Sequence, residues 1–135
     1  MAYKIIDIEG IGPVYAEKLI AAGITKPAEL LAKCAKPAGR KALAEETGIS
    51  DSLILTWANH ADLFRIKGVG PQFAELLEAA GVDTVKELSH RVPANLAKKL
   101  EEVNAEKKLT RRVPVEKEVK KMVEQAKNLP PVMTY

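Results

Sequence analysis

Cysteine and histidine are scarce in this chain of 135 residues, which has one cysteine, Cys34, and two histidines, His60 and His90. A lone cysteine excludes a disulfide within the chain, and three such side chains are too few for a four-ligand zinc site. We therefore expect Cys34 to be reduced, in or near the core, and each histidine to be a packed or surface residue rather than a catalyst.

Other absences narrow the class of protein. Aromatic residues make up 4% of the chain, and no apolar run approaches the roughly 20 residues of a membrane-spanning helix. The N-terminus lacks the basic-then-apolar pattern of a signal peptide, so we expect a cytoplasmic protein without a membrane partner. Acidic residues are scattered among lysines rather than converging as a metal nuclease requires, and no catalytic constellation stands out. We expect no enzymatic activity and no metal site.

The chain does contain an internal sequence repeat. Residues 8–31 and 66–89 are identical at 12 of 24 positions when one is shifted by 58 residues. An internal repeat constrains the architecture before any single element is assigned. In each copy two glycines flank an aliphatic residue, and a proline then opens an amphipathic helix. These segments are Gly10-Ile11-Gly12-Pro13 and Gly68-Val69-Gly70-Pro71.

Helical spacing of apolar residues dominates both copies, and only Tyr3–Ile8 resembles a strand, too short to build a sheet. We predict an all-α fold with two repeats, 1–64 and 65–129, followed by a flexible tail, 130–135. Each repeat should contain a helix, a short helix, a third helix and a long helix. The longer helices are expected at 13–22, 37–47, 50–63, 71–80, 93–103 and 114–128.

Local signals predict several helix ends and core positions. Gly81 suits the end of a helix, and Thr84 with Glu87 forms a capping box. In the first copy Lys26 replaces the threonine, and because lysine cannot accept a capping hydrogen bond, that helix start should be weaker. Trp57 and Met122 fall at matching places in the long helices, which indicates core packing rather than a ligand site.

The two hairpins differ in what precedes them. The helix 50–63 leads into the second hairpin, whereas only a short stub precedes the first. We expect helix 114–128 to fill the empty place, by folding back within the chain in preference to donation by another subunit, because closed pseudo-twofold packing hides both apolar stripes. The side chains expected to be buried against the first repeat are Val115, Val119, Met122 and Val123.

The repeated unit resembles the helix-hairpin-helix motif of DNA repair and recombination proteins, and two copies resemble the paired helix-hairpin-helix domain. The chain is also similar to small bacterial proteins of unknown function that carry this hairpin in an all-helical setting. The resemblance covers residues 8–24 and 50–82 well and helices 37–47, 93–103 and 114–128 poorly. It implies two helix-hairpin-helix repeats packed about an approximate twofold axis, as a SAM-like helical bundle.

In that family the hairpin binds a DNA phosphate through backbone N–H groups of the Gly-x-Gly turn and the helix start, often beside a basic side chain. Some members hold a monovalent cation on hairpin carbonyls, which is the only cofactor that the resemblance allows. Carried over by position, the DNA-binding candidates in the second copy are Gly68, Val69, Gly70 and Gln72. The charges of the neighbouring Arg65 and Lys67 would attract a phosphate, which adds these two residues to the candidates. The secondary candidates, in the first copy, are Gly10, Ile11, Gly12 and Val14. Phosphate contacts read no bases, so binding should be independent of sequence.

The distribution of charge favours the second copy as the one that binds DNA. The whole net charge of +3 falls in residues 66–135, because the acidic and basic residues of 1–65 balance. Its densest part, which would widen a DNA footprint, is Lys107, Lys108, Arg111 and Arg112. Asp7 and Glu9 beside the first hairpin would repel a phosphate, so we expect that hairpin to be structural. Neither hairpin has the basic residue that family members often carry after the proline.

Two functions remain open at this stage. The first is a DNA-binding module that holds the phosphate backbone, favoured by the charge of the second copy. The second is a helical adaptor that binds a protein partner or itself as a homodimer, through the hairpins or the 114–128 stripe. The acidic first hairpin and the modest total charge favour the adaptor, and fold alone does not choose between the two.

Overall fold

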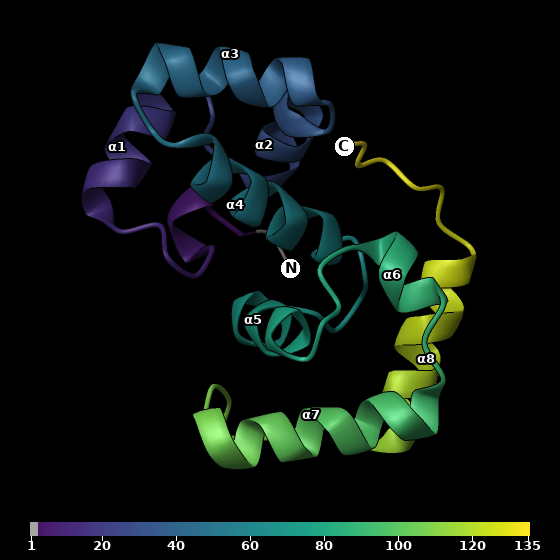
Figure 1. Ribbon diagram of the computed structural model, residues 1–135. Coiled ribbons are helices and arrows are strands. Elements are labelled where there is room, and N and C mark those ends of the chain that lie inside the picture. The colour runs from purple at the N-terminus through teal and green to yellow at the C-terminus, as the bar shows by residue number, and fades with distance from the viewer. Residues whose placement is uncertain (1–2) are drawn as a thin grey trace. The chain divides into compact units, whose positions relative to one another are not determined.

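The computed structural model describes residues 3–135, and within them the chain is all-helical, with no strand (Figure 1). This confirms the predicted all-α class. A short 3-10 helix, η1, covers Ile5–Asp7, where the sequence had only a weak strand signal. The α-helices are α1 (Pro13–Ala21), α2 (Pro27–Cys34), α3 (Pro37–Thr47), α4 (Asp51–Leu63), α5 (Pro71–Ala79), α6 (Val85–Ser89), α7 (Pro93–Lys107) and α8 (Glu116–Lys127).

Proline begins most of these helices, because its fixed φ suits the first helical position and its missing N–H would have no helical partner there. It stands at or next to the first position of α1, α2, α3, α5 and α7. Thr84 caps α6, accepting a hydrogen bond from the Glu87 N–H at 3.2 Å, which is one half of the predicted capping box. The Glu87 carboxylate accepts a hydrogen bond from Arg91 at 3.0 Å. Left-handed glycines follow several helix ends, among them Gly48 after α3.

The start of α2 is stabilised by the side chain of Glu29 and not by its capping residue, Lys26. The Glu29 carboxylate accepts hydrogen bonds from the N–H groups of Thr25 and Lys26, at 2.9 and 3.0 Å, and from the Thr25 hydroxyl. The Thr25 bonds are the main reason that the pKa of Glu29 lies below its usual value. Glu29, at the third position of the helix, thus satisfies N–H groups at a start where Lys26 has no side-chain acceptor.

The chain divides into two compact units. The first unit holds the described residues up to Asp62 together with Val132–Tyr135, and the second unit holds Leu63–Pro131. The helices follow the same order in each, α1 to α4 and then α5 to α8. In the first unit Leu19, Leu30 and Leu43 have 0% of their surface exposed, so α1, α2 and α3 all contribute to buried packing.

The core of the second unit includes α8, which corrects one prediction. Helix α8 packs on α6 and α7, and Val119, Met122 and Val123 belong to the same buried cluster as Leu77 of α5. The prediction that this stripe would be buried against the first repeat is wrong. Val115 is also wrong as a buried residue, because 60% of its surface is exposed. The last helix of the second repeat completes the repeat in which it lies.

Trp57 and Met122 confirm the prediction of core packing, with 1% and 5% of their surfaces exposed. Each lies beneath the first glycine of the hairpin in its own unit. A Cβ built on Gly10 would be 3.3 Å from the Trp57 indole nitrogen, and one built on Gly68 would be 3.8 Å from the Met122 methyl carbon. The long helix of each unit therefore supports the hairpin of the same unit.

The C-terminal tail, which the sequence predicted to be flexible, is hydrogen-bonded to the first unit. The Thr134 N–H donates to the Ala35 carbonyl at 2.8 Å, and the Arg40 guanidinium donates to the Thr134 carbonyl at 2.8 Å. Arg40 also lies over the Tyr135 ring, 5.6 Å from its centroid. A buried arginine on α3 thus anchors a segment almost a hundred residues further along the chain.

None of the helices in the described part of the chain combines the length and the apolar character that a membrane crossing requires.

Candidate functional site

The two hairpins, Ile8–Gly12 and Ile66–Gly70, have matching backbones. Gly10 has φ of 92° and Gly68 has φ of 94°, a region that glycine enters without the steric cost of a Cβ. The N–H of Ile11 donates to the Ile8 carbonyl at 3.1 Å, and the N–H of Val69 donates to the Ile66 carbonyl at the same distance. Each hairpin is therefore a hydrogen-bonded turn closed by its aliphatic residue.

The aliphatic residue also anchors the turn in the core. Ile11 has 4% and Val69 has 3% of its surface exposed. The next residue, Gly12 or Gly70, is extended and precedes the proline that starts α1 or α5. This arrangement presents the first turn of the helix, with its unpaired N–H groups, at the hairpin surface.

In the second hairpin, the backbone N–H groups fall into two sets. Those of Lys67 and Val69 donate to Gln125 and Ile66. Those of Gly68, Gly70 and Gln72 make no hydrogen bond within the described part of the chain. Val69 was expected to supply an N–H group to a ligand, and the structure shows that this group serves the turn instead. The available donors alternate along the chain and end at the positive end of α5.

Gln125 of α8 holds the second hairpin by two hydrogen bonds to the backbone of Lys67. Its Oε1 accepts from the Lys67 N–H at 2.9 Å, and its Nε2 donates to the Lys67 carbonyl at 3.3 Å. Both backbone groups of one residue are thus held by one side-chain amide. Gln125 was not among the predicted site residues, and no local sequence pattern marks it, since it lies 58 residues from its partner.

The two basic residues that precede Gly68 differ in availability. Lys67 is exposed. Arg65 is half-buried and donates to the Pro130 carbonyl at 2.6 Å, so its guanidinium also ties down the chain after α8. Of these two candidates, Lys67 is the one whose charge is placed in solvent beside the available N–H groups.

The predicted basic cluster lies on an ordered loop between α7 and α8. Asn104 of α7 holds the loop by accepting from the Thr110 N–H at 2.9 Å and donating to the Thr110 carbonyl at 3.0 Å. Lys108 ends α7 in the left-handed region, with φ of 52°. Exposed basic side chains of this loop and the helix end are those of Lys107, Lys108, Arg111 and Arg112.

Arg112 joins this loop to both α8 and α5. Its guanidinium forms two hydrogen bonds with the Glu118 carboxylate, at 2.6 and 2.9 Å, and lies 5.7 Å from the centre of the Phe73 ring. Phe73 follows Gln72 in the first turn of α5, so the loop reaches the helix start that carries the hairpin N–H groups. Arg112 is therefore engaged within the protein although its side chain is exposed, and Arg111 beside it is exposed as well.

The first hairpin has the same backbone in a different chemical setting. The Asp7 carboxylate accepts from the Lys4 N–H at 2.8 Å, and Glu9 is exposed next to Gly10. Val14, at the place of Gln72, has 67% of its surface exposed. Negative and apolar side chains thus surround the hairpin that the sequence predicted to be structural.

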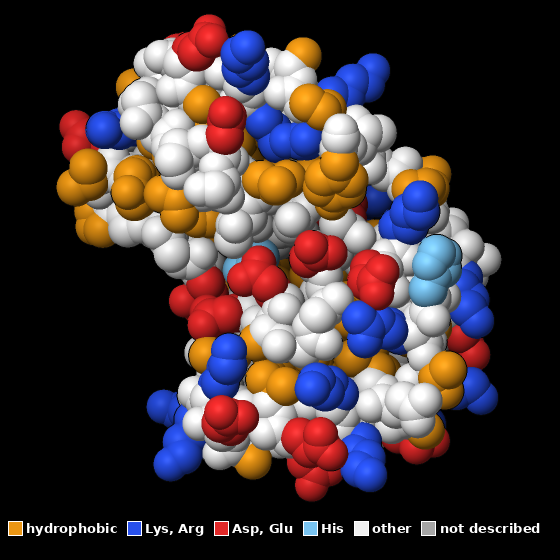
Figure 2. Space-filling view, viewed as in Figure 1, with side chains coloured by type: hydrophobic (Ala, Val, Ile, Leu, Met, Phe, Trp, Pro, Cys, Tyr) orange, Lys and Arg blue, Asp and Glu red, His pale blue; other side chains and the backbone are white. Residues whose placement is uncertain are grey.

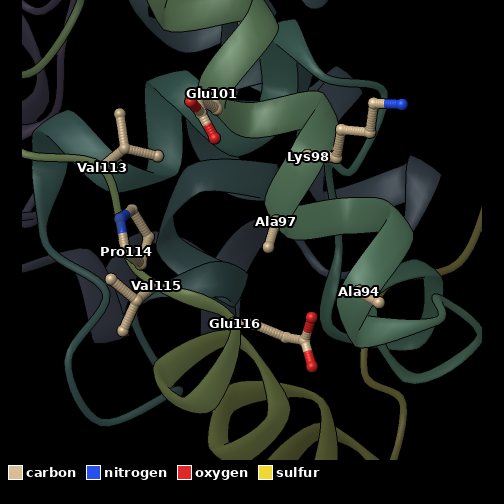
Figure 3. Close-up of a pocket in the computed structure, with 8 residues that line it drawn as sticks. All are labelled: Ala94, Ala97, Lys98, Glu101, Val113, Pro114, Val115 and Glu116. Atoms are coloured by element: carbon tan, nitrogen blue, oxygen red, sulfur yellow. The ribbon is translucent and has the colours of Figure 1, made fainter.

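A groove of about 540 Å³ lies in the second unit beside the basic loop (Figure 3). Ala94 and Ala97 of α7 face the segment Val113–Val115 across it, and Glu116 begins α8 at its lower edge. The carboxylates of Glu101 and Glu116 lie at its rim, while the Lys98 ammonium is directed away. Two carboxylates make this groove unfavourable for a phosphate, so it does not extend an anion site.

Over α7 the basic side chains are mixed with acidic ones (Figure 2). This mixture lowers the net field of that surface, because neighbouring opposite charges cancel at a distance. The described residues contain no group of three or more His, Cys, Asp or Glu side chains arranged to hold a metal ion. Cys34 is fully buried as expected, and burial raises the pKa of its thiol to about 11.

Comparison with known proteins gives one match. Residues 9–129 match a family model described as "Domain of unknown function (DUF4332)". The match begins at the second residue of the first hairpin and covers the second hairpin and helices α1 to α8. No curated protein and no solved structure matches the chain.

Proposed function

The chain belongs to the DUF4332 family, whose function is unknown, and we propose from its own residues that it binds DNA without sequence preference, holding a backbone phosphate at the second hairpin. The N–H groups of Gly68, Gly70 and Gln72 would donate to the phosphate oxygens. Lys67 would add a positive charge beside them. These groups bind an anion and offer no general base, so the proposal is one of binding and not of catalysis.

One observation carries this proposal, namely the set of N–H groups at the start of α5 that the fold leaves without a hydrogen-bond partner in the described residues. Such groups at a helix N-terminus favour a negative ligand through both hydrogen bonding and the helix dipole. Gly68 is exposed and lacks a Cβ, so a phosphate could approach the backbone closely.

Charge around the second hairpin supports DNA rather than a single small anion. Arg112 over Phe73 brings the α7–α8 loop to the start of α5, which would place Arg111 within a shared footprint. Lys107 and Lys108 would extend it. Because the duplex carries a charge about every 1.7 Å, several dispersed cations bind it better than they bind one phosphate.

The helix-hairpin-helix assignment belongs to the same proposal. The matched hairpin backbones, the shared order of helices and the paired supports Trp57 and Met122 favour two helix-hairpin-helix repeats with an approximate twofold relation. An experimental structure tests this directly through the superposition of residues 8–50 on 66–108. Unrelated arrangements of helices in the two repeats would reject it.

The binding test compares charge variants in fluorescence anisotropy with duplex, nicked and branched DNA. Lys67→Glu should weaken binding to all sequences alike, and loss of a phosphate contact should lower the slope of log K against log salt by about 0.9 for duplex DNA. Lys86→Glu is the matched control, because Lys86 is an exposed lysine of α6 outside the proposed footprint. Glu9→Lys should strengthen binding if the first hairpin also contacts DNA.

Two results would reject the DNA proposal. One is no affinity for any of these DNAs at about 50 mM salt, where phosphate contacts are strong. The other is an equal loss of affinity in Lys67→Glu and Lys86→Glu, which would indicate a diffuse charge effect rather than a hairpin contact. The first result would leave the helical adaptor as the remaining function, favoured by the exposed aliphatic side chains Val14 and Ile20 of the first unit. The second would reject the hairpin as the site of DNA binding.

A further inference from the structure

Helix α8 carries an exposed lysine, Lys121, on the side that holds the second hairpin. Gln125 bonds to both backbone groups of Lys67, and Glu118, seven residues earlier, pairs with Arg112 of the α7–α8 loop. Residues seven apart lie on one side of an α-helix, two turns from each other. Lys121 is three residues after Glu118 and four before Gln125, so it lies on the same side, one turn from each.

The ammonium group of Lys121 is available to a ligand. In the described part of the chain it forms no hydrogen bond and no ion pair. It still lies close enough to act on this side of the helix. The pKa of Glu118 is lowered mainly by the hydrogen bonds of Arg112 and then of the Val115 N–H, and the charge of Lys121 adds a smaller effect.

The residues one turn before Lys121 leave its charge largely uncompensated. Lys117, four residues earlier, has the same charge, and like charges at this spacing destabilise a helix. Glu118 has the opposite charge, but both of its carboxylate oxygens already accept hydrogen bonds from Arg112. A bound anion would relieve the repulsion between the two lysines.

The next lysine back along the helix, Lys120, lies in a different setting. It is about 100° around the helix from Lys121, away from the side that holds the hairpin. Glu116 and Glu124 are each four residues from Lys120, the spacing at which opposite charges attract on a helix. Glu124 is also three residues from Lys121, whereas Glu116 is near Lys120 alone. Of the two adjacent lysines, Lys121 is the one placed to act beside the hairpin.

The first repeat lacks this arrangement of charge. Trp57 and Met122, which support the hairpins of their own units, are 65 residues apart, and at this offset Lys121 corresponds to Thr56. The lysine before the second hairpin glycine is likewise replaced in the first copy, by Glu9. Neither lysine is therefore required by the hairpin fold. Both add positive charge at the hairpin that has the available N–H groups.

The spacing between Lys121 and the hairpin suits adjacent phosphates of one DNA strand. Four residues of helix span about 6 Å along the axis, which is the step from Lys121 to the amide that holds Lys67. The next charge on the same strand lies about 3.4 Å further along the duplex axis. The opposite strand is reached only across a groove about 6 or 12 Å wide. A lysine side chain at this position meets a phosphate of the same strand first.

We propose that Lys121 is a further DNA-binding residue, which contacts a phosphate next to the one at Gly68 on the same strand. This inference rests on the proposed function, because it adds a second contact to the phosphate site at the hairpin. Contacts that follow one strand do not require the complementary strand. The substrate class therefore includes single-stranded DNA, held by the hairpin and α8 together.

The test uses Lys121→Gln, which removes the charge and keeps a side chain of similar helix propensity. Fluorescence anisotropy is measured with a duplex and with a single strand of the same length. Affinity should fall roughly two- to fivefold for both DNAs at low salt. The slope of log K against log salt should fall by about 0.9 for the duplex and about 0.7 for the single strand.

Lys120→Gln is the matched control, because it makes the same change of charge at the adjacent exposed position of α8. It should change affinity and slope much less than Lys121→Gln does. Lys121→Arg keeps the charge and should retain the affinity of the wild type for both DNAs. Melting curves verify that the three variants are folded.

The outcomes separate this inference from the proposal on which it rests. If Lys67→Glu weakens binding while Lys121→Gln and Lys120→Gln behave alike, the hairpin site stands and the contact by α8 is rejected. A loss of affinity in Lys121→Gln for the duplex alone would place the contact on the opposite strand and overturn the assignment to one strand. A wild type that binds neither DNA would reject both proposals.

Discussion

Gln125 holds both backbone groups of Lys67, with its amide oxygen 2.9 Å from the Lys67 nitrogen and its amide nitrogen 3.3 Å from the Lys67 oxygen. A helix at the end of the second unit thereby fixes the residue that precedes the hairpin glycine. The same helix supplies Met122 beneath Gly68. Hairpin geometry in this unit therefore depends on α8, which follows it by about fifty residues.

Replacing Gln125 by alanine should loosen the second hairpin. Loss of two partly exposed hydrogen bonds should lower the free energy of unfolding by about 1–2 kcal/mol. Glu124→Ala is the control, because the Glu124 side chain is exposed on the same helix. Urea titration followed by circular dichroism measures both variants. Equal stabilities for the two would show that the Gln125 contacts contribute nothing to the hairpin.

Met122→Ala tests the assignment of α8 to the second core. Removing most of a buried side chain with 5% exposure should cost about 2–4 kcal/mol of unfolding free energy. Val115→Ala, at a position with 60% exposure, should change stability by less than about 0.5 kcal/mol. A reversed order of these two effects, measured by thermal or urea unfolding, would contradict the observed packing of α8.

Gly39 in α3 lies too close to α2 to carry a side chain. A Cβ on Gly39 would be 1.8 Å from the Lys33 carbonyl oxygen, so Gly39→Ala must push the two helices apart. We expect a loss of about 1–3 kcal/mol in unfolding free energy. Gly12→Ala is the matched control, since Gly12 has φ of −83° and no atom within 4 Å of the added carbon. Comparable stability of the two variants would reject the close contact.

The Arg112–Glu118 pair should give stability a defined pH dependence. Hydrogen bonds from Arg112, and then from the Val115 N–H, lower the pKa of Glu118 from 4.5 to about 2. Because the folded pKa lies below the unfolded one, the contribution is fully present above about pH 5 and is lost as pH falls towards 2. The difference in unfolding free energy between wild type and Glu118→Gln should therefore shrink through this window. A difference that stays constant from pH 7 to 2 would contradict the pairing.

Much of the local structure could be predicted from sequence, because it depends on short-range rules. The Gly-x-Gly-Pro segments predicted a turn followed by a helix, and Gly10 and Gly68 do adopt positive φ. Thr84 caps its helix, and the matching places of Trp57 and Met122 predicted their burial. Each of these features is determined by a few neighbouring residues or by the repeat itself.

Long-range pairings could not be predicted in the same way. The apolar stripe of α8 required burial but did not specify a partner, and the preferred choice, the first repeat, was wrong. The pairing of Arg112 with Glu118 and the hydrogen bond from the Val69 N–H to the Ile66 carbonyl engage two groups of the predicted DNA site within the protein. Such choices depend on three-dimensional proximity, for which the sequence of one chain gives no local signal.

The central claim is that backbone N–H groups of the second hairpin contact a DNA phosphate. The most direct test is a titration of ¹⁵N-labelled protein with a short duplex at low salt, followed by amide chemical shifts. The account predicts that the amides of Gly68, Gly70 and Gln72 shift most, while that of Val69, already bonded to Ile66, and those of the first hairpin shift little. Binding that leaves the three amides of the second hairpin unmoved would contradict the account.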